Sequence, residues 1–102
     1  MEWLCQSAGR GRQTLSAMEQ GKPLARMELN LYKKDTYTIS GISFDGQVSE
    51  QQRETVMLGA CEWFRQQQIH LLLGCRWAQN WFAGHPQELS LIAQGVKTKS
   101  RF

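Results

Sequence analysis

The chain has 102 residues, which is the size of one small domain. Its apolar fraction is 41% and its charged fraction is 21%, a composition typical of a folded protein and not of a disordered one. The sequence contains no run of about eighteen apolar residues, which excludes a membrane-spanning helix, and its start lacks the basic stretch and apolar run of a secretory signal.

Three cysteines, Cys5, Cys61 and Cys75, are spread along the chain with no close pair among them. A disulfide framework needs cysteines in pairs, and an odd number of widely spaced ones indicates reduced thiols. We therefore expect a cytoplasmic protein whose cysteines mainly pack in its interior.

Charge is distributed unevenly around a net value of +3. Residues 1–34 hold six basic and three acidic side chains, residues 35–96 hold three basic and six acidic ones, and the last six residues add Lys97, Lys99 and Arg101. The basic ends are either ordinary solvated termini or arms that contact phosphate or an acidic partner. Neither end has the run of five or six like charges of a dedicated arm, which favours the first interpretation.

Residues 1–26 show no sustained hydrophobic period. Their glycines predict a loop near Gly9 and Gly11, and Thr14 to Gln20 predicts a short helix that Gly21 ends. We interpret this part as an N-terminal extension, residues 27–96 as a single core domain, and residues 97–102 as a basic tail.

The next two segments alternate apolar and polar residues, as half-buried strands do. The first is 27–31 and the second is 36–40, and the polar residues 33–35 form a turn between them. This spacing predicts an antiparallel hairpin.

Gly41 marks a change in the phase of the second strand. Tyr37 and Ile39 are apolar before it, whereas Ile42 and Phe44 are apolar after it. A strand with a period of two cannot change parity and keep facing one core unless a residue is inserted, so we predict a β-bulge or bend at Gly41. Two short strands separated by a turn are the alternative.

The main helix is predicted over residues 49–68. Ser49 followed by Gln52 is a capping-box pattern, and an apolar stripe follows at spacings of three and four. Gly59 inside the helix indicates close packing against the sheet.

The remaining elements are shorter. Residues 69–73 are either the end of the main helix or a third strand, and periodicity does not decide between them. A short aromatic helix is predicted over 75–83, and a last helix is predicted over 87–94 after Pro86.

These elements predict an α+β fold. A small antiparallel sheet, bent at Gly41, packs under one main amphipathic helix, with short C-terminal helices beside it. We expect six residues to contribute to the core: Trp63, Phe64, Ile69, Trp77, Trp81 and Phe82.

Four residues could in principle bind a metal: Cys61, His70, Cys75 and His85. They lack the close pairs that hold zinc, so we predict no metal site and no cofactor.

Nucleophilic catalysis would need a base beside a thiol, with a third group to orient the base. Cys75 with His70 or His85, oriented by Glu88 or Asp45, is conceivable, but no spacing requires it. Glu50 and Glu54 share a helix face and are more simply solvated charges near the helix start. We predict no catalytic residues and no enzyme.

Nucleic-acid binding needs cations for the phosphates. The candidates are Arg10, Arg12, Lys22, Arg26, Lys33 and Lys34. A helix-turn-helix over residues 76–94 matches poorly, because polar residues occupy positions that should be packed.

A protein-binding surface could instead use the aromatic residues Trp77, Trp81 and Phe82. We predict a small non-catalytic regulatory or adaptor module that binds another protein or itself as a homo-oligomer. A nucleic-acid-binding protein ranks second, and a small enzyme with a Cys/His site ranks third.

Overall fold

The computed structural model describes residues 1–93, and the predicted basic tail at 97–102 lies outside them. The elements along the chain are β1 (Glu2–Gly9), β2 (Arg12–Glu19), β3 (Lys22–Lys33), β4 (Thr36–Phe44), α1 (Glu50–Gln66), β5 (His70–Leu73), α2 (Arg76–Ala83) and the 3-10 helix η1 (Pro86–Leu91). The α+β prediction is confirmed. No helix within residues 1–93 has the length and hydropathy to cross a membrane.

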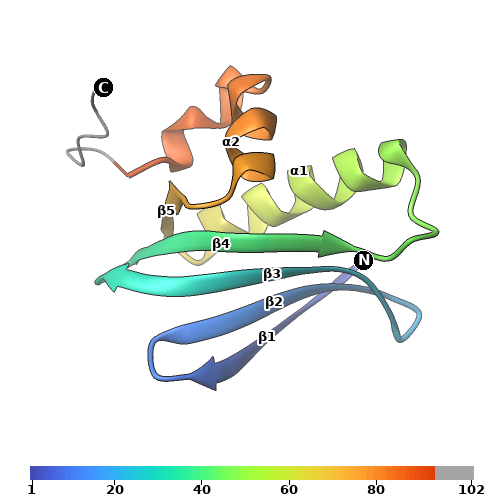
Figure 1. Cartoon of the computed structure of the whole chain (residues 1–102), viewed down its shortest axis with the longest axis horizontal. Helices are drawn as coiled ribbons and strands as arrows, with labels where there is room; N and C mark the ends of the chain where they lie inside the picture. Colours follow the sequence, from blue (N-terminus) through green and yellow to red (C-terminus); the bar gives the residue numbers. More distant parts are fainter. Residues whose placement is uncertain (94–102) are drawn as a thin grey trace.

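Five strands form one sheet in the order β1-β2-β3-β4-β5. The first four run antiparallel to their neighbours, while β5 is parallel to β4 and is reached through α1. Both α-helices lie on one side of the sheet (Figure 1). Parallel neighbours run in the same direction, so the chain must return to the starting end of the sheet between them. A tight turn is too short for this return, and a crossover is required.

The hydrophobic core lies between the sheet and the helices. Leu15, Met27 and Leu29 from β2 and β3 pack against α1 and α2 and are almost completely buried. Burying each such side chain stabilises the fold by roughly 1.5–3 kcal/mol. Of the six predicted core residues, Phe64, Trp81 and Phe82 are buried, and Trp63, Ile69 and Trp77 pack against the cluster half-buried.

In residues 1–26, the loop predicted near Gly9 and Gly11 is the turn between β1 and β2, but the short helix predicted for Thr14 to Gln20 was wrong. Residues 1–26 form β1, β2 and the start of β3, and the predicted domain boundary at residue 27 falls inside β3. Gln20 and Gly21 have φ angles of 51° and 78°, so they make a tight hairpin turn between β2 and β3 and do not end a helix. Leu15 and Ala17 then face the core at the period of a strand.

The bulge at Gly41 is confirmed. Glu28 on β3 lies opposite Gly41, and the next residue, Leu29, lies opposite Ile39, so Ser40 is the inserted residue. Because of this insertion, β4 continues to Phe44 with its apolar residues on the helix side throughout. The alternative of two strands separated by a turn is excluded.

The main helix is confirmed as α1, with Ser49 as its N-cap. Gln52 N–H donates to Ser49 Oγ at 3.2 Å, and Ser49 N–H donates to Gln52 Oε1 at 2.9 Å. Gly59 packs closely against the sheet as predicted, since a Cβ there would lie 3.0 Å from the ring of Trp3 on β1.

The C-terminal elements agree in part with the sequence analysis. Residues 70–73 are a strand, which settles the choice left open for 69–73, and α2 falls within the predicted helix at 75–83. The predicted helix at 87–94 is instead the 3-10 helix η1. It ends early because the chain returns to the sheet, where Ala93 N–H donates to Leu71 O at 2.9 Å.

Candidate functional site

The parallel strands β4 and β5 stay together only over a short distance. Thr36 to Ile39 pair with His70 to Leu73, and the last hydrogen bond runs from Gly74 N–H to Ile39 O at 2.9 Å. Beyond Ile39, β4 continues to Phe44 with β3 on one side and no strand from residues 1–93 on the other. The strands therefore part, and the second half of β4 faces an opening toward α2.

A cavity of about 290 Å³ lies between the first turns of α1 and α2, beside Phe44 at the end of β4. It is lined by Glu50, Arg53 and Glu54 from the first turns of α1 and by Trp77 and Trp81 from α2. Its walls thus combine two carboxylates, one guanidinium and two indole rings, which is the mixture of apolar surface and few polar groups typical of ligand sites.

Phe44, the last residue of β4, links the two helices beside the cavity. Its ring centroid lies 5.1 Å from that of Trp77. The guanidinium carbon of Arg53 lies 5.1 Å from the Phe44 ring centroid, a cation–π contact that holds this side chain at the cavity. Arg53 Nε is buried and has no hydrogen-bond partner among residues 1–93.

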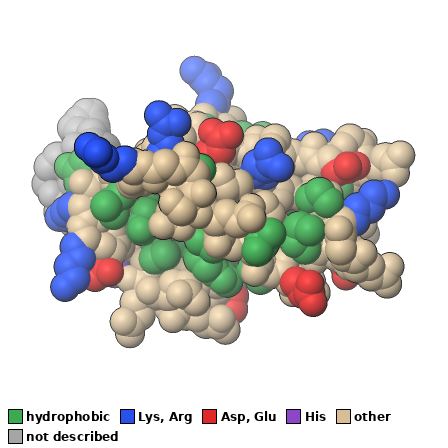
Figure 2. Space-filling view, turned by 90° about the horizontal axis from the view of Figure 1, so that it is seen from below, with side chains coloured by type: hydrophobic (Ala, Val, Ile, Leu, Met, Phe, Trp, Pro, Cys, Tyr) green, Lys and Arg blue, Asp and Glu red, His purple; other side chains and the backbone are tan. Residues whose placement is uncertain are grey.

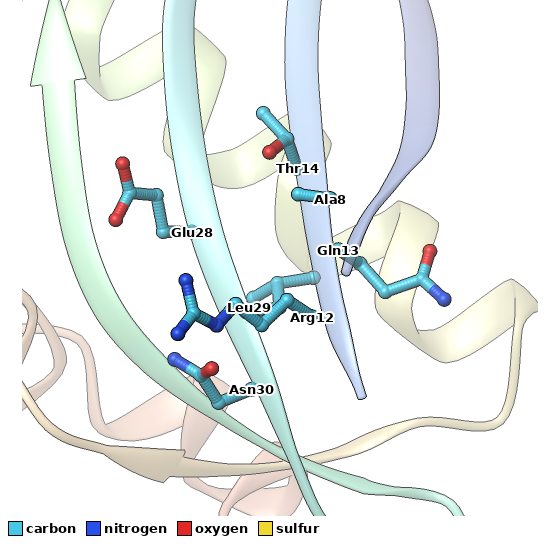
Figure 3. Close-up of a pocket in the computed structure, with 7 residues that line it drawn as sticks. All are labelled: Ala8, Arg12, Gln13, Thr14, Glu28, Leu29 and Asn30. Carbon is cyan, nitrogen blue, oxygen red and sulfur yellow. The ribbon is translucent and has the colours of Figure 1, made fainter. Parts of the chain in front are cut away.

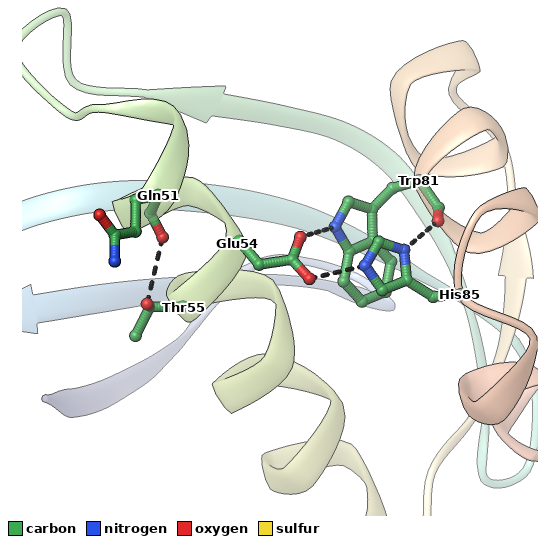
Figure 4. Close-up of polar contacts among 5 residues, drawn as sticks. All are labelled: Gln51, Glu54, Thr55, Trp81 and His85. Carbon is green, nitrogen blue, oxygen red and sulfur yellow. Dashed lines mark hydrogen bonds and ion pairs between the residues drawn. The ribbon is translucent and has the colours of Figure 1, made fainter.

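Three residues tie α1 to α2 through a hydrogen-bond network (Figure 4). The indole Nε1–H of Trp81 donates to Glu54 Oε1 at 2.9 Å, and His85 Nε2 lies 2.6 Å from Glu54 Oε2. His85 Nδ1 lies 2.7 Å from the carbonyl oxygen of Trp81, and its ring stacks on the indole at a centroid distance of 3.7 Å.

The geometry of this network determines the charge of His85. Both ring nitrogens face oxygens that only accept, a backbone carbonyl and a carboxylate, and only the doubly protonated imidazolium can donate to both. The bond to the Trp81 carbonyl and the contact with Glu54 raise the pKa of His85. The bonds from His85 and Trp81 lower the pKa of Glu54. The geometry therefore favours the imidazolium form of His85 beside an ionised Glu54.

The connection from β4 to α1 has little free hydrogen-bonding capacity. Gln47 N–H donates to Asp45 Oδ1 and Val48 N–H donates to Asp45 O, while the capping box engages the N–H groups of Ser49 and Gln52. Glu50 adds a negative charge in the first helical turn. A phosphate group would meet few free N–H groups there, and it would meet negative charge.

Comparison with solved structures gives a likeness in fold. No family model matches the sequence, and no curated protein matches it. An NMR structure from Staphylococcus aureus, described as a "GCN5-like putative N-acetyltransferase", superimposes with a TM-score of 0.58 at 10% sequence identity. The superposition covers 96% of this chain and 94% of the other. The two chains share a fold.

This comparison contradicts our prediction of a non-catalytic adaptor and the corresponding prediction of no enzyme. The protein with the shared fold is described as an enzyme, and the correspondence extends over nearly the whole of both chains. The sequence analysis weighed only nucleophile and metal patterns as evidence for an enzyme.

The cysteine and histidine residues do not form the triad considered from the sequence. Cys61 is buried in the core, and burial raises its pKa to about 12, so it stays a thiol. Cys75 is the N-cap residue of α2 and is half-buried, while His70 is exposed on β5. Both nitrogens of His85 are engaged by Glu54 and Trp81 and not by a thiol.

The two carboxylates considered for orienting a histidine base, Glu88 and Asp45, bind other groups. Glu88 pairs with Arg65 of α1, and Asp45 accepts the backbone N–H of Gln47. Within residues 1–93, no three side chains of the His, Cys, Asp and Glu types come together as metal ligands would.

The six basic residues considered for nucleic acid are divided among three places. Arg12 and Arg26 lie on the sheet face without helices, where Arg12 borders a hollow together with Glu28 and Asn30 (Figure 3). Arg10, Lys33 and Lys34 lie at the turns of one end of the sheet, and Lys22 lies at the opposite end. No observation tests binding of nucleic acid, which stays a prediction.

The aromatic residues considered for a protein partner belong mainly to the core. Trp81 is 8% exposed and Phe82 is 1% exposed, whereas Trp77 is half-buried at the cavity. Only Trp77 therefore presents appreciable surface, and the partner contact itself stays a prediction.

Sequence reasoning named Trp77 and Trp81 but did not bring them together with Arg53 and Glu54 at one cavity. Glu54 was interpreted as a solvated charge, and Arg53 was not considered. Glu54 lies 27 residues before Trp81 and 31 before His85, so its partners have no fixed spacing that would reveal them. The only available signal was the position of Arg53 and Glu54 in the first turns of a helix that follows a strand.

Proposed function

We propose that the protein is an acyltransferase that moves an acyl group from a thioester donor to an amine. The observation that carries the proposal is the cavity between α1 and α2 at the end of β4, in a chain whose fold is shared with a protein described as an N-acetyltransferase. Fold alone does not establish function, so the argument depends on what this cavity can bind.

The second half of β4 suits an extended donor. An extended chain of amides can pair with the backbone of a strand that lacks a neighbour, as a peptide does when it adds to a sheet edge. Between Ser40 and Phe44, β4 has such an unpaired side, and it leads directly to the cavity. The arm of a coenzyme A thioester is a chain of this kind, and its acyl end would lie near Trp77.

The β4–α1 connection fits the phosphate end of such a donor poorly. Its N–H groups are largely occupied, and Asp45 and Glu50 repel anions. We therefore place donor recognition mainly in the thioester arm and not in its phosphates.

Arg53 is the cation at the cavity. Its guanidinium group lines the cavity and can donate to a carbonyl of the donor, and its contact with Phe44 fixes the side chain in place. In the reaction, the amine nitrogen forms a bond to the thioester carbonyl carbon, the carbon–sulfur bond breaks, and the proton lost by the amine ends on the released thiol. Water exclusion by Trp77 and Trp81 favours the amine over hydrolysis.

The test is acetyl transfer from acetyl-coenzyme A to a panel of primary amines, followed as the release of free thiol. We expect thiol release that depends on the amine. Replacing Arg53→Gln removes the charge and should lower kcat/KM at least about tenfold, the loss expected for one charged hydrogen bond.

Arg26→Gln is the matched control, since Arg26 lies on the sheet face opposite the helices, and it should leave the rate unchanged. Binding of the donor is measured by the NMR signals of Phe44 and Trp77 at millimolar acetyl-coenzyme A. Unchanged signals would mean that the donor does not bind and would contradict the proposal.

We also propose a cytoplasmic location. It is supported by the three cysteines, all of which are free thiols in the structure. Fractionation of cells that express the full chain tests it.

A further inference from the structure

The two edges of the sheet differ. The outer side of β5 is covered, because Ile92 bridges to Leu71 and Ala93 N–H donates to Leu71 O. On the opposite edge, β1 has β2 on one side and no backbone partner from residues 1–93 on the other. One row of backbone N–H and C=O groups of β1 is therefore available to another strand.

Strand β1 lacks the features that usually protect a sheet edge. Proteins prevent edges from pairing with short strands, prolines, charges or bulges. This strand has eight residues, and from Trp3 to Gly9 it contains no charge and no proline. Its one irregularity lies between Ser7 and Gly9, next to the turn. The remainder is an uninterrupted edge.

The side chains of β1 also favour burial. Trp3 packs against α1 on the helix side, and Leu4 on the other side is 43% exposed. Seen from below, from the side on which β1 lies in Figure 1, hydrophobic side chains form a band across the molecule with basic side chains along its upper border (Figure 2).

We propose that a second copy of this chain pairs antiparallel with β1, so that two sheets join into one. The occupant is a second copy because the ends of β1 complement each other in charge: Glu2 lies at its start, and Arg10 follows its last residue. In an antiparallel pair of identical strands, the start of each copy lies beside the end of the other.

Charge also selects the register. Side chains that face each other across an antiparallel pair lie on the same side of the sheet. One residue of β1 must therefore lie directly opposite its own copy, with the two-fold axis between the two. With Gln6 opposite Gln6 of the second copy, Cys5 faces Ser7, Leu4 lies beside the bulged residue Ala8, and Glu2 lies past the bulge, beside the turn that carries Arg10. With Cys5 on the axis, Leu4 would face Gln6, and with Ser7 on the axis, Leu4 would lie past the bulge beside the charged turn. The first register therefore buries Leu4 against an apolar residue and brings the oppositely charged ends together.

The oligomeric state of the full chain tests the proposal. We expect light scattering after gel filtration to give twice the chain mass of 11.7 kDa. Gln6→Lys places two lysines opposite each other and should raise the dimer dissociation constant about tenfold or more. Gln87→Lys adds the same charge to the exposed side of η1 and should leave the dimer unchanged.

A crosslink tests the register. In a Cys5→Ser background, Gln6→Cys should form an intermolecular disulfide under mild oxidation, because the two thiols face each other across the axis. Leu4→Cys in the same background should not, since it lies beside Ala8. A monomeric wild type, a dimer that survives Gln6→Lys, or equal crosslinking of the two cysteine variants would overturn the proposal. None of these outcomes depends on acyl transfer.

Discussion

Glu54 is the residue on which the contact between α1 and α2 depends. Its carboxylate accepts from Trp81 and His85, and it adds to the effect of the Trp81 carbonyl oxygen in raising the pKa of His85. Because Trp81 also lines the cavity, the side chain that joins the helices also shapes the candidate site.

The charge of His85 makes stability depend on pH. Its pKa is raised in the folded state, so the stabilisation is complete below the ordinary histidine value of about 6.5 and is lost as pH rises through the higher folded value. Glu54 acts in the opposite direction: its lowered pKa gives stability that is lost as pH falls through the folded value. The pair therefore contributes most between the ordinary carboxyl and imidazole values.

We expect the substitution His85→Gln to lower the unfolding temperature more at pH 6 than at pH 9. His70→Gln is the control, because His70 is the other histidine and is exposed on β5. Thermal unfolding followed by circular dichroism measures both variants. An equal difference at the two pH values would show that His85 is not charged in the folded state.

At the scale of elements, the joint between β4 and β5 determines where the two strands part. The strands are held at Gly74, whose N–H donates to Ile39 O, and they part immediately beyond it. A side chain at this position has no room, since a Cβ would lie 2.6 Å from Thr38 Cγ2 and 3.0 Å from Ile39 O.

Gly74→Ala should therefore destabilise the protein by about 1–3 kcal/mol, because the backbone oxygen of Ile39 cannot move without breaking the last hydrogen bond of the pair. Urea unfolding measures the loss. Gly84→Ala is the matched control: its Cβ would have only ordinary contacts, at 3.7 Å and beyond. If both alanine variants had the stability of the wild type, the close approach at Gly74 would be refuted.

At the scale of the whole molecule, the N-terminal strands are part of the fold. Leu15 and Ala17 of β2 are each 1% exposed, and Trp3 of β1 packs on Gly59 of α1. Without these strands, α1 would lose much of the surface that it covers, and β3 would become an exposed edge.

A chain shortened to residues 22–102 should accordingly fail to fold. We expect it to lose the cooperative thermal transition and to bind a dye specific for exposed apolar surface, whereas the full chain does neither. A cooperative transition in the shortened chain would instead support our earlier division of the sequence, in which residues 1–26 are an appendage.

The sequence by itself determined the elements whose signals are local. The hairpin of β3 and β4, the bulge at Gly41 and the capped helix α1 follow from alternation, parity and a capping box, all of which act over a few residues. The tertiary structure alone decided the parallel pairing of β5 and the network of Glu54, Trp81 and His85. Those contacts join residues about thirty positions apart, and their free energy comes from packing across the core, which leaves no fixed spacing in the chain.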